Sequence, residues 1–275
     1  MKEEGAGPAS IAWRDAVAKS RGQAGADEGA WAPDEVWIRD ADDAPPARRT
    51  KPTDPDAGPR PGRKPKTLPS EVASELSQAA SGAKVERLRQ RLTDAAGAYE
   101  RDRYGDAARM LKPLAEQAPG AAAVRELYGL TLYRLGRWDA AIKELEAFRT
   151  LSDSADQLPT LTDCYRAKKR WKDVDATWET LRRESPGADL LAEGRLVYAG
   201  SLADRGRLPE AIEVLEHAKT DSKKPKPDHL RTWYALADLY ERAGEVPRAR
   251  ELFRRILRFD AELYDVAERL SAIGG

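Results

Sequence analysis

Three residues of this sequence have side chains that often act in catalysis or in metal binding: Cys164, His217 and His229. A thiol nucleophile needs a nearby base and an electropositive environment, yet no histidine lies near Cys164 in the sequence. The two histidines flank a polar linker and have no companion at the spacing of metal ligands. The sequence also lacks a glycine-rich phosphate loop, a GxSxG motif and a recognisable carboxylate pair. It therefore predicts no enzymatic activity, no cofactor and no metal site.

The composition argues against some classes of binding partner and indicates the cellular compartment. The 275 residues include 47 basic and 47 acidic side chains, and this balance argues against a dominant polyanionic partner. No apolar run approaches the length of about twenty residues that a transmembrane helix needs. The N-terminus lacks a secretory signal pattern, and a single cysteine fits a reducing compartment. We therefore expect a cytoplasmic protein that does not enter a membrane. The absence of asparagine is typical of GC-rich bacterial genomes, so we also expect a bacterial source.

Residues 1–68 differ in kind from the rest, because they are rich in proline and charge and lack apolar periodicity. Such a segment buries too little apolar surface to offset its ordering entropy, so we expect a disordered tail. Two tryptophan-containing islands, 11–19 and 31–43, interrupt it. The second is either a docking motif or a chance cluster of apolar residues in a tail. The residues of this candidate motif are Trp31, Val36 and Trp37.

From residue 69 onward, apolar residues recur at steps of three, four and seven, which place them on one face of a helix. A small or narrow residue recurs at separations of 34, 33, 37 and 38 residues, the period of a repeated helical hairpin. Its positions are Ala107, Ala141, Val174, Ala211 and Ala249. The expected hairpins pair helices 83–101 with 104–117, 121–135 with 138–151, 155–168 with 171–184, 189–205 with 208–219, and 228–243 with 246–258.

Glycine and proline set the expected ends of these helices. Gly136, Gly206 and Gly244 end first helices, because glycine readily adopts the left-handed conformation that satisfies the last carbonyls. Pro159 lies within the third unit's first helix, and it fits only if it lies in the first turn. That placement requires Ser154 or Asp156 as the N-cap.

These units resemble the tetratricopeptide repeat family, whose pattern is W-x2-L-G-x2-Y, then A-x3-F, then P. The fifth unit matches it best, through Trp233, Leu236, Ala237, Tyr240, Ala249 and Phe253. The second unit matches through Gly129, Leu132, Ala141 and Leu145. The resemblance runs from about Arg89 to the C-terminus, and Asp94 departs from it, which suggests that the first unit is a degenerate cap.

The resemblance implies an all-α, right-handed solenoid. We expect a tail at 1–68, a pre-repeat helix at 69–82, five hairpins at 83–259 and a C-terminal capping helix at 260–275.

In this family the inner faces of the first helices line a concave groove that binds a peptide. Carried over by repeat position, that face has thirteen residues here: Glu126, Leu130, Tyr133, Arg134, Asp163, Arg166, Glu193, Leu196, Asp204, Tyr234, Asp238, Glu241 and Arg242. Family members that clamp a C-terminal carboxylate use paired asparagines, which this chain lacks. The alternative is that these charges form a solvated helix face without a ligand.

The resemblance implies a scaffold or adaptor that binds another protein or a peptide, without enzymatic activity. The alternative is an adaptor for RNA or nucleoprotein that uses the basic stretch 47–66 and the lysine-rich linker 220–228. We disfavour nucleic acid, because the basic stretch has no interleaved aromatic residues to stack bases and contains Asp54 and Asp56. The polar face of the last helix argues against self-association, so we expect a monomer.

Replacing the small residue of one hairpin tests the repeat register. Ala211→Leu should lower the free energy of unfolding by about 1–3 kcal/mol, because the added methyl and methylene groups overpack the contact between two helices. Chemical denaturation measures this change. A melting temperature equal to that of the unmodified protein would show that the register is wrong.

Overall fold

The fold is all-helical in the residues that this computed structural model describes, namely 70–79, 83–184, 187–218, 220 and 224–274. The predicted tail, with Trp31, Val36 and Trp37, lies outside them. Within this described part there are twelve helices and no strand. The helices are α2 (Ser70–Ala79), α3 (Ala83–Tyr99), α4 (Tyr104–Gln117), α5 (Ala122–Arg134), α6 (Trp138–Ser152), α7 (Leu158–Ala167), α8 (Trp171–Glu184), α9 (Ala188–Asp204), α10 (Leu208–Glu216), α11 (Pro227–Arg242), α12 (Val246–Leu257) and α13 (Val266–Ala272).

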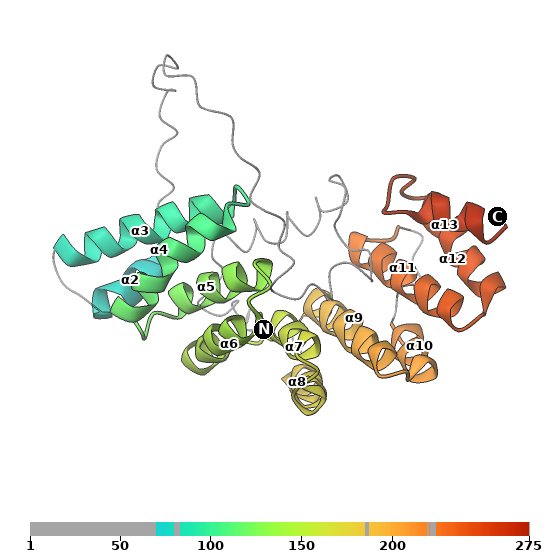
Figure 1. The fold of residues 1–275 in the computed structure, drawn as a ribbon, viewed down its shortest axis with the longest axis horizontal. Helices are drawn as coiled ribbons and strands as arrows, with labels where there is room; N and C mark the ends of the chain where they lie inside the picture. The colour runs from blue at the N-terminus through green and yellow to red at the C-terminus, as the bar shows by residue number, and fades with distance from the viewer. Residues whose placement is uncertain (1–69, 80–82, 185–186, 219, 221–223, 275) are drawn as a thin grey trace, which may run out of the picture.

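The helices from α3 to α12 form five consecutive hairpins, as the sequence predicts. Each second helix also packs against the first helix of the next hairpin, so every unit contacts its neighbours. Figure 1 shows the hairpins following a curved path from α2 to α13, with α6, α8 and α10 on the outer side of the arc. The first helices therefore form one layer and the second helices another.

All five hairpins close with the same turn. In each turn, a backbone N–H beyond the first helix donates to the carbonyl five residues earlier, at 2.8–3.0 Å. The residue before that donor has a positive φ and itself donates to the carbonyl three residues back, which completes a Schellman motif. Three of these positive-φ residues are the predicted glycines, but Asp102 (φ 56°) and Lys169 (φ 55°) take the position in the first and third units.

The small residue of each second helix is buried at the centre of its hairpin. Ala107, Ala141, Val174, Ala211 and Ala249 each have 0% exposure. A second close contact occurs at Gly129, where an added Cβ would lie 2.7 Å from the side chain of Leu145 on α6. The two helices of the second unit therefore meet through residues that cannot be enlarged.

The apolar core continues from unit to unit. It consists of three clusters, which cover the first two units, the middle of the array and the last two units. Tyr128 packs against the first and the middle clusters, and Tyr198 packs against the middle and the last. Helix α2 joins the first cluster through Val72 and Leu76, and the Ala123 N–H at the start of α5 donates to the Glu75 carboxylate at 3.0 Å.

The N-cap of α7 differs from the one expected from the sequence, and Asp94 has a polar environment. Helix α7 begins at Leu158 with Gln157 as its N-cap, so Pro159 does lie in the first turn, but neither Ser154 nor Asp156 caps the helix. These two side chains bond to each other instead, because the Ser154 hydroxyl donates to Asp156 at 2.5 Å within the preceding loop. Asp94 is exposed and accepts a hydrogen bond from Gln90 at 3.0 Å.

Substitutions at two equivalent turn residues should change the free energy of unfolding in opposite directions. Lys169→Gly should raise the free energy of unfolding by about 0.5–1 kcal/mol, because glycine relieves the cost of a left-handed conformation in a residue with a Cβ. Gly206→Ala, at the equivalent position, should lower it by about 1 kcal/mol. Urea titrations of both variants measure the two changes. Destabilisation by Lys169→Gly would show that the turn at 169 is not left-handed.

Candidate functional site

Among the residues with catalytic potential, the Cys164 thiol is inaccessible. Cys164 has 0% exposure, and burial, helped by the Asp163 carboxylate, raises the pKa of its thiol well above the ordinary value. The ring of His217 lies 2.7 Å from the Glu213 carbonyl at the exposed end of α10. Nowhere in the described residues do three or more His, Cys, Asp or Glu side chains gather as metal ligands would. The described helices also include none that is long and apolar enough to cross a membrane.

The layer of first helices is held together by polar contacts between successive units. The Tyr133 hydroxyl on α5 donates to the Asp163 carboxylate on α7 at 2.8 Å. Further along α5, Glu126 accepts from the side-chain amide of Gln157 at 2.9 Å, and both residues are buried. Two predicted groove residues of the second unit and one of the third therefore bond to a neighbouring unit.

The same kind of contact joins the third and fourth units. The Arg166 guanidinium reaches from α7 to the Asp204 carboxylate on α9 through two hydrogen bonds, at 2.5 and 3.0 Å. It lies across the backbone of α9 at Gly200, where an added Cβ would be 2.4 Å from a guanidinium nitrogen. Arg166 is 8% exposed and the side chain of Asp204 is 35% exposed, so only the arginine of this bidentate pair is nearly buried.

At the C-terminal end, helix α13 packs against α12 and reaches α11 through the side chain of Arg269. This guanidinium donates to Asp238 at 2.8 Å and to Glu241 at 2.9 Å, and its other amino group donates to the Tyr234 hydroxyl at 3.3 Å. The Tyr234 hydroxyl donates in turn to Asp265 at 2.7 Å, and burial of this ring raises the pKa of its hydroxyl. The last unit thus uses its predicted groove residues to hold the final helix.

These contacts correct the expected placement of four side chains. Glu126, Leu130, Asp163 and Tyr234 are only 0–1% exposed, so they do not lie on an open face. Leu130 belongs to the apolar core that α2 shares. Glu126 and Asp163 bond to a neighbouring unit, and Tyr234 bonds to Asp265 at the start of α13. Repeat position alone does not show whether the neighbouring unit covers a residue.

The remaining predicted residues keep partial or full exposure. Arg134 and Arg242 are exposed; Arg134 lies 4.8 Å from the ring centroid of Tyr104, and Arg242 lies 3.7 Å from Asp238. Glu193 and Leu196 are half-buried on α9, whose Asp204 has a side chain that is 35% exposed. Exposed inner-face residues are therefore concentrated on α9 and at the ends of α5 and α11.

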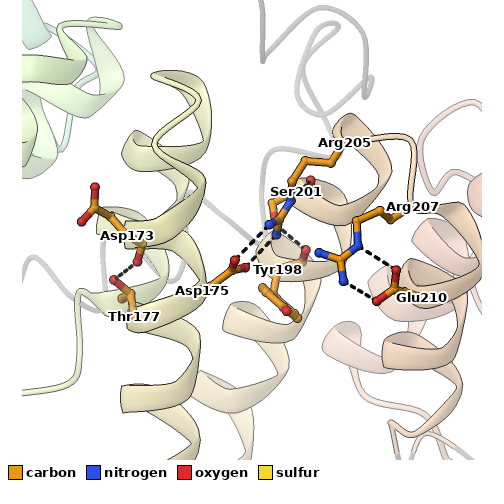
Figure 2. Close-up of polar contacts among 8 residues, drawn as sticks. All are labelled: Asp173, Asp175, Thr177, Tyr198, Ser201, Arg205, Arg207 and Glu210. Carbon is orange, nitrogen blue, oxygen red and sulfur yellow. Dashed lines mark hydrogen bonds and ion pairs between the residues drawn. The ribbon is translucent and has the colours of Figure 1, made fainter.

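The outer side of the third and fourth units contains contacts that the sequence does not predict. Figure 2 shows Arg205 at the end of α9 binding the Asp175 carboxylate of α8 through two hydrogen bonds, at 2.8 and 3.0 Å. Arg205 also donates to the Ser201 hydroxyl at 3.1 Å. Earlier on α9, the ring of Tyr198 stacks on Trp178 with centroids 5.2 Å apart. These pairs fix the position of α9 against α8.

Removing Arg269 tests the role of the final helix. Arg269→Ala should lower the free energy of unfolding by about 3 kcal/mol, because it leaves the nearly buried Asp238 carboxylate without its closest cation. Arg242→Ala is the matched control: it removes a more exposed arginine that lies 3.7 Å from the same carboxylate, and it should cost less than about 1 kcal/mol. Urea denaturation measures both. Equal effects would show that α13 does not depend on Arg269.

Comparisons with known proteins agree with this architecture. A family model described as tetratricopeptide repeat matches residues 92–156 and 201–263. A crystal structure of a thermophilic tetratricopeptide repeat protein from Thermus thermophilus superposes with a TM-score of 0.50 at 16% identity. The superposition covers 68% of this chain and 98% of that one, and at this identity it shows the fold alone. A search of curated proteins finds no match. The predicted fold class is confirmed: the described residues form an all-α helical solenoid, and two stretches of the chain match the tetratricopeptide repeat model.

Proposed function

We propose that this protein is an interaction scaffold that binds a partner protein or peptide on its layer of first helices, at a surface centred on α9. Tetratricopeptide repeats are generally protein–protein interaction modules. The proposal includes the sequence-based expectations of a cytoplasmic location, a monomeric state and no enzymatic activity. The observation that carries it is the incomplete burial of an apolar helix.

Helix α9 has apolar residues around its whole circumference, a pattern that is typical of a helix buried on all sides. Nevertheless, most residues of its first half remain partly exposed. The partly exposed apolar residues are Leu190, Leu191, Leu196, Val197 and Tyr198. Four of them also pack against the apolar core, and their exposed parts offer apolar surface to another molecule.

The neighbouring first helices show the contrast. On α7, every residue from Leu158 to Arg166 is buried, and on α11 the buried residues include Leu230, Trp233 and Tyr234. The inner faces of these helices are covered by the contacts described above. At the end of the helix, Asp204 is already paired with Arg166, so the surface lies in the first half of α9. A peptide with apolar anchors would fit it.

Site-specific photo-cross-linking tests the proposed surface. A photoreactive amino acid at Leu196, in cells that naturally produce the protein, should give discrete cross-linked products. These products should weaken when Val197→Glu places a charge among the apolar residues of this surface. The same amino acid at Leu151, which is 45% exposed on α6, is the control and should not give these products. Identical products from both positions would contradict a partner surface on α9.

A further inference from the structure

The second unit contains an ion pair that closes its two helices. Arg125 on α5 lies 2.5 Å from the Glu144 carboxylate on α6, and the two side chains are 15% and 8% exposed. Arg125 also donates through Nε to the Pro119 carbonyl at 3.2 Å. In this unit, each of the two nearly buried charges therefore has a partner of opposite sign.

The fourth unit retains the arginine and lacks the glutamate. The second and fourth units can be aligned on their left-handed turn residues, Gly136 and Gly206, which are 70 positions apart. Equivalent residues of the two units are therefore also 70 positions apart. This register places Arg195 of α9 where the second unit has Arg125, and Val214 of α10 where it has Glu144. The fourth unit thus repeats half of an ion pair.

Arg195 is accordingly a half-buried cation to which the described part of the chain supplies no anion. Within these residues it makes no hydrogen bond and no ion pair, and burial lowers the pKa of its guanidinium. The positive charge of Arg182 on α8 lowers this pKa further. Leaving a charge partly desolvated without a partner is unfavourable, unless a ligand supplies the opposite charge.

Two acidic residues of α8 and α9 pair with cations other than Arg195. Glu179 accepts a hydrogen bond from Arg182 at 3.0 Å, and Asp189 lies 3.7 Å from Lys226. The packing brings the two arginines into the same region: an added Cβ at Gly194 would lie 2.1 Å from the side chain of Leu181, and these two residues directly adjoin Arg195 and Arg182. Two guanidinium groups from α8 and α9 therefore share one surface.

We propose that Arg195, with Arg182 beside it, forms a carboxylate-binding site between α8 and α9, and that the acidic segment 27–43 of this chain occupies it. The proposal deepens the interaction surface proposed for α9 and rests on it. The planar guanidinium donates two parallel hydrogen bonds to a carboxylate, which makes an arginine in this position suited to this ligand class.

Charge, aromatic content and reach favour this segment as the occupant. Segment 27–43, DEGAWAPDEVWIRDADD, has seven acidic residues, one arginine and two tryptophans. One turn along α9 from Arg195, the partly exposed ring of Tyr198, which stacks on the buried Trp178, offers an aromatic surface for a tryptophan side chain. The 26 residues between the segment and Ser70 span up to roughly 90 Å when extended. Tethering also gives the segment an effective concentration of about the millimolar range.

The first unit provides a matched control position. The same register places Arg91 at the position of Arg195, with Met110 opposite it in place of the glutamate. Arg91 is exposed, so water solvates its charge. A substitution at Arg91 removes an equivalent arginine without removing the proposed site.

Fluorescence anisotropy with a labelled synthetic peptide of residues 27–43 tests the site. The protein is the full chain, with the seven acidic residues of its own segment changed to Asn or Gln so that it cannot compete. The peptide should bind this protein, and Arg195→Gln should weaken binding at least tenfold. Arg91→Gln should leave the affinity unchanged. Val214→Glu should also abolish binding, because it supplies the missing carboxylate within the chain.

The possible outcomes distinguish the carboxylate site at Arg195 from the partner-binding surface proposed for α9. Failure of the peptide to bind, or equal binding by Arg195→Gln, overturns the carboxylate site even if cross-linking at Leu196 identifies a partner. Equal binding of an unrelated acidic peptide overturns the choice of segment 27–43. Thermal melts guard against unfolding: Arg195→Gln should melt no lower than the unmodified chain, whereas Arg125→Gln, which strands Glu144, should melt lower.

Discussion

The contact on which this structure depends is the one between successive units, in which both helices of a unit pack against the first helix of the next. A single hairpin buries only part of its apolar surface, so each unit needs a neighbour to complete its core. Tyr128 and Tyr198 pack against two core clusters each, which makes the apolar core continuous. Polar pairs such as Tyr133 with Asp163 and Arg166 with Asp204 then fix how successive units are placed. The fold is therefore held together from one unit to the next.

This way of assembling the solenoid also determines which surface is left for a partner. In the second, third and fifth units, inner-face polar residues bond to the following helix, and in the last case that helix is α13. Helix α9 accepts the Arg166 contact at its C-terminal end, at Asp204, while its first half keeps partly exposed apolar residues. Arg195 lies in that same half. The proposed binding surface is thus the part of the inner layer that intramolecular contacts use least.

Sequence periodicity was sufficient for the fold and insufficient for the site. The 0% exposed small residues, the glycine turns and the five hairpins all follow from local spacing, because each is a property of one helix or one turn. The left-handed turns at Asp102 and Lys169 could not be predicted, because aspartate adopts that conformation only occasionally and lysine rarely, and closure of the hairpin imposes it. The burial of Glu126 and Asp163 depends on partners about thirty residues away. The missing anion beside Arg195 is recognised only by comparison with the equivalent ion pair of Arg125 and Glu144, which the sequence does not reveal.

Hydrogen–deuterium exchange on the full chain tests most directly whether the α9 surface is a binding site for the acidic segment. The unmodified protein is compared with a chain in which the acidic residues of segment 27–43 are changed to Asn or Gln, with peptides from α5 as an internal reference. The account predicts faster exchange of backbone amides in the first half of α9 in the neutralised chain, and unchanged exchange in α5. Identical exchange of α9 in the two proteins would contradict it.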